Sequence, residues 1–307
     1  MKLAIVQDGP VFNILNETIE KTCDYIRKAA EEKVDLIVFG ESWLSGYPVW
    51  LDVCKDVNLW DHEPVKSVWA NMFQNAVDVS SKDLDPIKKM LAENNMYATI
   101  GINEKVLNGK GNNTIYNSLL TFDNSGNLVN HHRKLMPTYT EKLVHGLGDG
   151  AGLNSIDTHF GRLGGLICWE HWMPLTRQAM HDQGEDLHIG VWPFAKGMHH
   201  LASRNYAIEG RCHVLTVGQV MHKDELPNGM ELSDAIEPDA SGLLLRGGSA
   251  IYGPDGEPIV EPLYNERKLI LAELDLSKNT KEYMNLAVSG HYQRPDIFNF
   301  EVHKKRY

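Results

Sequence analysis

Short apolar runs alternate along this chain with segments of helical periodicity, and this alternation limits its fold more than any other feature. Residues 2–7 form an apolar run of strand length, and residues 16–30 carry Ile19, Cys23 and Ile26 at helical spacing. Residues 34–40 form a second run of the type that is buried on both faces of a parallel sheet. The chain therefore begins as strand, helix and strand, and Asn16 is predicted to cap the helix.

The alternation continues to about residue 276. A helix is expected after Asp85 and Pro86, a typical cap and first-turn pair. Further strands and helices are expected in the segments 97–106, 114–123, 128–135, 162–167, 173–184, 187–193, 199–210, 213–220, 241–262 and 268–276. Because no internal repeat or Ser/Gly/Pro linker divides these elements, we predict a single α/β domain of layered sheets and helices.

The charge balance and the cysteines narrow the classes of partner. Lys and Arg number 30 against 41 Asp and Glu, a formal net charge of −11, so no nucleic-acid partner is expected. The chain has no apolar run long enough to cross a bilayer, so no membrane partner is expected either. Four cysteines without a CxxC pair favour reduced thiols. We expect a soluble protein of a cytoplasmic compartment.

Three reactive side chains follow predicted strands. Glu41 comes directly after LIVFG, Lys134 ends LVNHHRK, and Cys168 comes directly after GGLI. Ligands in α/β folds bind beyond the carboxyl ends of the strands, so we expect an acid, a cation and a thiol to meet there. Each residue alone is weak evidence, since an isolated cysteine after a strand is more often a packed core thiol. Their joint placement indicates a catalytic site.

The chemistry of these three groups is complementary. A thiol with an ordinary pKa near ~8.5 is mostly protonated at neutral pH, so it needs a base and a nearby positive charge. Glu41 is the predicted base, whose pKa burial would raise, and Lys134 is the predicted cation. The backbone N–H of Trp169, at the start of a helical turn, is the natural donor to a developing anion.

Three blocks of the sequence resemble the signature blocks of the nitrilase branch of the carbon-nitrogen hydrolase superfamily. They are FGESWLSGYP at 39–48, HRKLMPTYTEKLVHGLGDGAGL at 132–153 and GGLICWEHWMPL at 164–175. NYAIEGRCHVL at 205–215 and RGGSAIYGPDGE at 246–257 are further matches, so the similarity spans nearly the whole chain. Glu170, within CWEHW, is typical of nitrilases, although an acid at the start of a helix is also stabilised by the helix dipole.

The resemblance implies a four-layer αββα sandwich over residues 1–276, with a C-terminal segment, 277–307, that contributes oligomer contacts. It implies Glu41, Lys134 and Cys168 as the catalytic triad, and Glu141 as a further buried carboxylate that orients the lysine. Neither a metal nor another cofactor is implied. The residues expected to contact substrate are Tyr47, Thr138, His145, Trp169, Trp172 and Pro193. His145 departs from the family pattern, which often has tryptophan there, and this leaves aryl or aliphatic preference open.

The predicted function is hydrolysis of a small organic nitrile to a carboxylic acid and ammonia, by a homodimer or larger homo-oligomer. An amidase or N-carbamoyl hydrolase with the same triad is the first alternative, and a catalytically silent binding protein is the second. The histidine pairs 131–132 and 199–200 lack the spacing of a metal site and are expected at the surface or a pocket rim.

Overall fold

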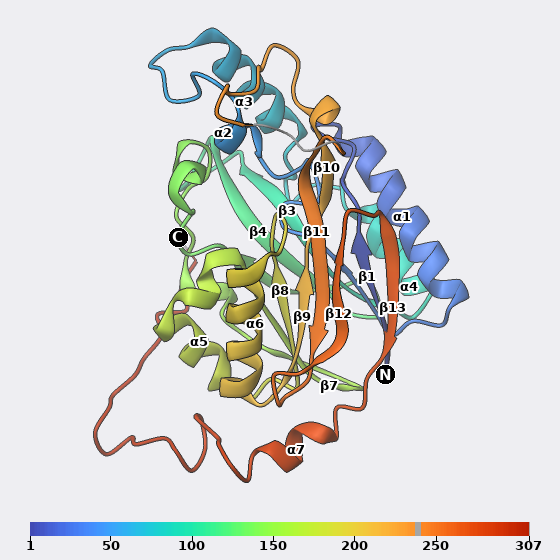
Figure 1. Ribbon diagram of the computed structural model, residues 1–307, viewed down its shortest axis with the longest axis vertical. Coiled ribbons are helices and arrows are strands. Elements are labelled where there is room, and N and C mark those ends of the chain that lie inside the picture. Colours follow the sequence, from blue (N-terminus) through green and yellow to red (C-terminus); the bar gives the residue numbers. More distant parts are fainter. Residues whose placement is uncertain (237–240, 307) are drawn as a thin grey trace.

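The computed structural model describes residues 1–236 and 241–306. Two β-sheets pack face to face, and helices cover the outer face of each sheet (Figure 1). The predicted αββα sandwich is therefore confirmed. Within the described residues, no helix combines the length and apolar character needed to span a membrane.

The first sheet has strand order β13-β1-β2-β3-β4-β5, with β1 parallel to β2, and β2 parallel to β3. The β3–β4 and β4–β5 pairs are antiparallel. The strands are β1 (Lys2–Gln7), β2 (Leu36–Phe39), β3 (Tyr97–Val106), β4 (Thr114–Phe122), β5 (Leu128–Arg133) and β13 (Lys268–Glu273).

The second sheet has strand order β10-β11-β9-β8-β7-β6, with β12 paired to β11. Its central strands β7, β8 and β9 are parallel. The strands are β6 (Ile156–Thr158), β7 (Gly161–Ile167), β8 (Leu187–Val191), β9 (His213–Val217), β10 (Val220–His222), β11 (Leu243–Tyr252) and β12 (Pro258–Tyr264).

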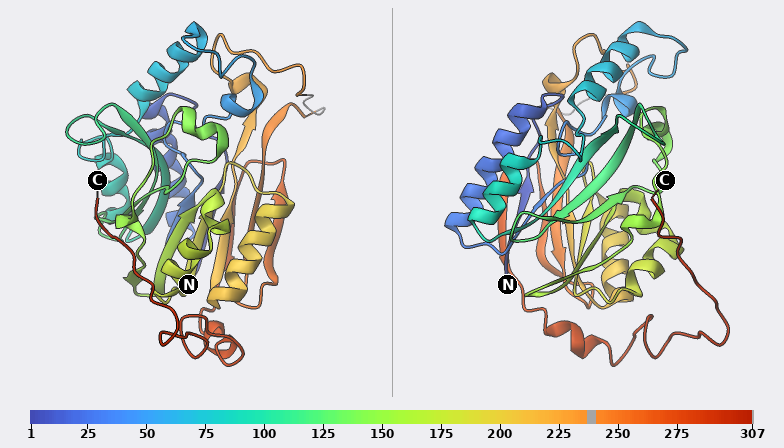
Figure 2. Two further views of the ribbon diagram at one scale, coloured as in Figure 1. Left: turned by 90° about the vertical axis from the view of Figure 1, so that its left-hand side faces the viewer. Right: turned by 180° about the vertical axis from the view of Figure 1, so that it is seen from behind.

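The helices form the outer layers. Helices α1 and α4 cover the first sheet, and α5 and α6 cover the second (Figures 1 and 2). The α-helices are α1 (Leu15–Glu31), α2 (Trp50–Val53), α3 (Glu63–Asn75), α4 (Asp85–Glu93), α5 (Pro174–His181), α6 (Gly197–Gly210) and α7 (Lys278–Glu282), and the 3-10 turns are η1 (Tyr139–Leu143), η2 (Gly150–Gly152), η3 (Cys168–Trp172) and η4 (Lys223–Glu225). Helix α1 begins at Leu15, one residue before Asn16, so the cap predicted at Asn16 is wrong.

The alternation of side chains along each strand explains the layers. In β1, Leu3 and Ile5 join the core between the two sheets, while Ala4 and Val6 join the core beneath α1. All four side chains are fully buried. Since successive strand residues point to opposite faces, a strand covered on both sides needs a continuous apolar run, and this is the pattern of residues 2–7.

The segment after β13 folds back over its own chain. Residues 277–306 first form the short helix α7 and then return along the surface to the side of the molecule that carries η2 (Figure 2). Near its end, the Lys304 ammonium donates to Asn154 Oδ1 at 2.7 Å, and Arg306 pairs with Asp149 at 3.4 Å. The last residue of the predicted C-terminal segment, 307, lies outside the described residues.

Candidate active site

The carboxyl ends of three strands supply the reactive groups. Glu41 lies two residues after β2, Lys134 directly follows β5, and Cys168 directly follows β7. The three side chains are almost entirely removed from solvent, with residue exposures of 0%, 1% and 4%. The sequence placed them at equivalent positions, and the structure brings them together in the space between the sheets.

The two carboxylate oxygens of Glu41 have different surroundings. Oε1 accepts hydrogen bonds from Asn117 Nδ2 at 2.7 Å and from Lys134 Nζ at 2.9 Å. Oε2 is buried and has no hydrogen-bond partner among the described residues. Burial raises the pKa of Glu41 to about 7, although Lys134 opposes this shift. Glu41 is thus a carboxylate with one oxygen held in place and one oxygen free to take a proton.

Lys134 is an ammonium enclosed by carboxylates. Its Nζ lies 2.9 Å from Glu41 Oε1 and 2.9 and 2.7 Å from the two oxygens of Glu141. Burial alone would lower the pKa of Lys134, but Cys168, Glu41 and Glu141 outweigh burial and raise it well above its ordinary value. The lysine therefore stays charged.

Glu141 is held by the turn in which it lies. Its carboxylate accepts hydrogen bonds from the Thr138 backbone N–H at 3.1 Å and from the Tyr47 hydroxyl at 3.1 Å. Burial opposes ionisation, but the charge of Lys134 leaves the pKa of Glu141 below its ordinary value. Glu141 is thus an ionised partner that fixes the position of Lys134.

Cys168 begins the 3-10 turn η3 with a backbone φ of 53°, in the left-handed region that non-glycine residues rarely adopt. Burial and the charge of Glu41 raise the pKa of the thiol well above its ordinary value, while Lys134 and the Trp169 backbone N–H act in the opposite direction. The resting sulfur is therefore protonated, with a base and a cation beside it.

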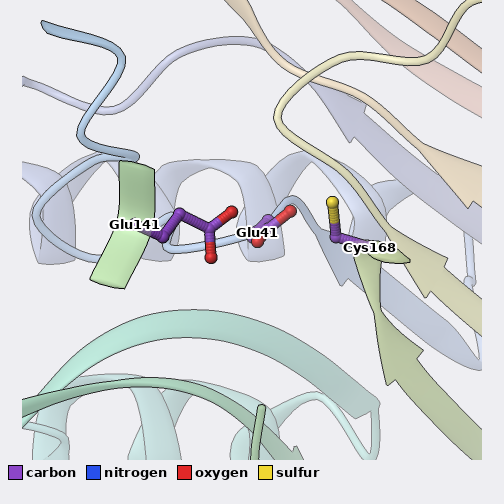
Figure 3. A group of neighbouring side chains, drawn as sticks. All are labelled: Glu41, Glu141 and Cys168. Atoms are coloured by element: carbon purple, nitrogen blue, oxygen red, sulfur yellow. The ribbon is translucent and has the colours of Figure 1, made fainter. Parts of the chain in front are cut away.

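Figure 3 shows Glu41 between Glu141 and Cys168, with the Glu141 carboxylate directed toward Glu41. One carboxylate oxygen of each glutamate and the Cys168 Sγ all lie within 4.8 Å of one another. Such a group can in principle hold a metal ion, but the Lys134 ammonium already bridges the two carboxylates. The arrangement suits nucleophilic catalysis by a thiol.

The predicted substrate contacts differ in their relation to this cluster. Tyr47 and Thr138 contact Glu141 directly, as described above. His145 is buried, and its Nε2 lies 2.9 Å from Asn103 Oδ1. Burial lowers the pKa of His145 to about 4, so it is a neutral ring. At the position where the resembled family pattern often has tryptophan, this chain thus has a buried polar ring next to Glu141.

The remaining predicted contacts are less direct. Trp169 is 39% exposed, and its backbone N–H acts on the Cys168 thiol. Trp172 packs against the core between the sheets. Pro193 accepts a hydrogen bond from the Gln219 backbone N–H, and the Gln219 side chain donates to the Glu41 carbonyl. Pro193 is therefore tied to the site through Gln219.

Glu170 is a buried carboxylate that links two segments of the site. It accepts hydrogen bonds from His132 Nε2 at 2.8 Å and from the backbone N–H groups of Leu135 and Ile167, both at 2.8 Å. These contacts join the segment that follows Lys134 to the segment that precedes Cys168. His132 is fully buried, and His199 and His200 are also buried, so the expectation that both histidine pairs lie at the surface or a pocket rim is wrong.

Sequence reasoning missed two residues that hold Glu41. Asn117, in β4, holds the Glu41 carboxylate, and Gln219, after β9, holds its carbonyl. Asn117 interrupts the apolar run TIYNSLLTF, and a polar residue in a buried strand is a signal that identifies it as a candidate. Gln219 gives no comparable signal.

Comparisons with known proteins assign the family. A family model described as carbon-nitrogen hydrolase matches residues 2–281. An aliphatic nitrilase of Sinorhizobium fredii (strain HH103) is 34% identical over 98% of this chain and 95% of its own length. Nitrilase 2 of Arabidopsis thaliana is 32% identical over 99% of this chain and 89% of its own length. This chain therefore belongs to the nitrilase branch of the carbon-nitrogen hydrolase family and is a hydrolase that acts on carbon–nitrogen bonds.

Solved structures share the fold. A carbon-nitrogen hydrolase from Helicobacter pylori G27 superimposes with a TM-score of 0.70 at 20% identity over 97% of each chain. XC1258 from Xanthomonas campestris, a CN-hydrolase superfamily protein, gives a TM-score of 0.68 at 17% identity over 99% of each chain. At these identities the likeness supports the two-sheet architecture alone.

Proposed function

We propose that this protein hydrolyses an organic nitrile to a carboxylic acid and ammonia, with Cys168 as nucleophile, Glu41 as general base and acid, and Lys134 as the stabilising cation. One observation carries the proposal: Glu41 keeps an unpartnered oxygen in the cluster that holds the protonated thiol and the ammonium. The nitrilase relatives support the choice of nitrile as substrate.

In the first half of the reaction the Cys168 thiol proton passes to Glu41 as sulfur bonds to the nitrile carbon. The nitrile nitrogen then takes that proton, which gives a thioimidate. The Trp169 N–H and Lys134 are placed to stabilise charge on the nitrogen. All three Lys134 protons are engaged by the two glutamates, so one of these contacts must lengthen before the ammonium donates to substrate.

In the second half Glu41 takes a proton from water while the water oxygen adds to the thioimidate carbon. Protonation of the nitrogen breaks the carbon–nitrogen bond, releases ammonia and leaves a thioester. A second water, deprotonated by Glu41, releases the carboxylic acid and returns the proton to sulfur. If the carbon–sulfur bond of the tetrahedral species breaks first, an amide is the product.

The test is a panel of nitriles and matched amides, with ammonia, acid and amide measured for each. Release of acid and ammonia from nitriles is the expected result. Turnover of amides alone would assign the protein to an amidase or N-carbamoyl hydrolase activity. If no nitrile or amide of the panel reacts and none forms a covalent adduct with Cys168, the result would favour the alternative of a catalytically silent binding protein.

The rate of hydrolysis is expected to fall as the pH drops below about 7. Glu41 must be ionised to accept the thiol proton, and its pKa is raised to about 7. The value of kcat/KM should therefore decrease about tenfold per pH unit on the acid side. The check is a pH–rate profile with circular dichroism at each pH as the folding control. A plateau extending to pH 5 would remove Glu41 from the role of base.

We also propose a cytoplasmic homo-oligomer in which 1–276 is the catalytic domain and 277–307 adds contacts between subunits. Exposed apolar side chains on the outer helices support the dimer: Leu175 is 70% exposed on α5, and Leu201 is 61% exposed on α6. Light scattering should give at least twice the chain mass, and Leu201→Glu should lower it to a monomer. A monomeric wild-type protein would contradict this proposal.

A further inference from the structure

Behind Cys168, four polar side chains are buried on the helix-covered side of the second sheet. His171 lies in η3, His188 in β8, Glu185 just before β8, and Tyr206 in α6. None is more than 3% exposed, and the proposed reaction uses none of them. Because a buried polar group without a partner destabilises the folded state, each of the four side chains is expected to have a hydrogen-bond partner.

The four side chains form one continuous chain of hydrogen bonds that ends at the backbone carbonyl of Cys168. His171 Nδ1 lies 2.7 Å from the Cys168 carbonyl oxygen, and His171 Nε2 lies 3.0 Å from His188 Nε2. His188 Nδ1 lies 2.8 Å from Glu185 Oε1, and the Tyr206 hydroxyl lies 2.5 Å from Glu185 Oε2.

Donor and acceptor counting fixes the protons of this chain. A carbonyl oxygen only accepts, so His171 Nδ1 carries a proton, and in a neutral ring its Nε2 must accept. His188 Nε2 then donates, and His188 Nδ1 accepts. The remaining donor must be Glu185 Oε1, which requires a protonated carboxyl group. If Glu185 were ionised while both rings stayed neutral, two lone pairs would face each other at one of the contacts.

The backbone around the chain is shaped to make room for it. A Cβ atom on Gly164 of β7 would lie 1.7 Å from Glu185 Oε1, and one on Gly190 of β8 would lie 2.9 Å from His171 Nε2. Any larger residue at Gly164 would displace the carboxyl group. The two strands therefore have glycine, without a side chain, at the places where these four polar side chains lie against the sheet.

The chain meets Cys168 where its backbone is strained. The φ of 53° places Cys168 in a conformation that is retained only when its surroundings hold it. We propose that Glu185, His188 and His171 are positioning residues that hold the Cys168 carbonyl, and so the direction of its thiol, with a protonated Glu185 that donates to His188. This inference rests on the proposed function for its kinetic effect, but not for its proton positions.

The electrostatic surroundings agree with the proton count. Burial lowers the pKa of His171 to about 3 and that of His188 well below its ordinary value, so both rings are neutral. Burial raises the pKa of Glu185 to about 8, against the opposing effects of Tyr206 and His181. The groups facing Glu185 are His188 on β8, Tyr206 on α6, His181 on α5 and Cys212 before β9.

The first experiment compares Glu185→Gln with His188→Phe. The glutamine amide donates to His188 and its carbonyl accepts from Tyr206, so it reproduces the protonated carboxyl group and should keep kcat near the wild-type value. Phenylalanine keeps the ring stacked on Tyr206 but breaks the chain. His188→Phe should lower kcat about 10²-fold with KM little changed, because a small misplacement of a nucleophile costs this much.

His213→Phe is the matched control, since His213 is a fully buried histidine on the neighbouring strand β9 that bonds to Asn279 instead. It should keep the wild-type kcat. A second readout is the alkaline limb of kcat: ionisation of Glu185 should lower kcat above about pH 8, and Glu185→Gln should lose this limb. A wild-type kcat in His188→Phe, or an equal loss in Glu185→Gln, would overturn the proposal.

Ring ¹⁵N chemical shifts test the proton positions without any substrate. His171 should be the Nδ1–H tautomer and His188 the Nε2–H tautomer. Replacing Glu185 with leucine should change the ¹⁵N shift of His188 Nδ1, which loses its donor, and should leave His171 as the Nδ1–H tautomer. Opposite tautomers would refute the chain even if nitriles are hydrolysed. If the protein shows the expected tautomers but hydrolyses no nitrile, the proposed function is rejected and the proton positions are still supported.

Discussion

Cys168→Ala is expected to abolish nitrile hydrolysis. Removal of the nucleophile of a covalent mechanism costs on the order of 10⁴- to 10⁶-fold in rate, because the remaining groups act only through it. The loss should appear in kcat/KM, measured as ammonia release. In parallel, mass spectrometry of the wild-type protein quenched during turnover should find a thioimidate or thioester mass on the peptide that contains Cys168, and the variant should carry none.

Cys212→Ala is the matched control for this substitution. Cys212 is also a fully buried thiol, but it packs in the core between the second sheet and its outer helices. Its replacement should leave the adduct and the rate close to those of the wild type. Hydrolysis that persists in Cys168→Ala, or an adduct found on another cysteine, would show that the nucleophile has been assigned wrongly.

The sequence predicted the convergence of Glu41, Lys134 and Cys168 for a physical reason. Each follows an apolar run of strand length, and the ends of such strands lie along one edge in a layered α/β fold. The burial of residues on both faces of β1 and β2 was likewise readable from their continuous apolar character. The motif blocks then supplied Glu141, which no periodicity would have placed beside Lys134.

The partners of these residues were not readable, because they come from distant parts of the chain. Asn117 lies 76 positions from Glu41, and Gln219 lies 178 positions away. His188 sits in a short apolar run, where a single histidine gives no sign of the chain of hydrogen bonds that it joins. The expectation of surface histidines failed for the same reason, since the buried His132 pairs with Glu170, which lies 38 positions away.

Lys134→Met is expected to destabilise the fold as well as stop the reaction. The substitution leaves the carboxylates of Glu41 and Glu141 buried together without the ammonium that lies within 2.9 Å of both. Removing one partner of a buried ion pair typically costs about 3–5 kcal/mol in the free energy of unfolding. Urea unfolding of the variant and the wild type at pH 8 measures this cost, and Lys142→Met, an exposed lysine in the same turn η1, is the control.

The pH dependence of that loss has a definite sign. Without Lys134, burial and mutual repulsion should raise the pKa values of both carboxyl groups in the folded variant above their values in the unfolded chain. The folded state then binds more protons than the unfolded state, so the stability of the variant falls as the pH rises through the folded pKa values. The difference from wild type should therefore be larger at pH 8 than at pH 5, and adding Glu141→Gln should recover part of it. A variant equal in stability to the wild type at pH 8 would mean that Lys134 does not offset these two charges.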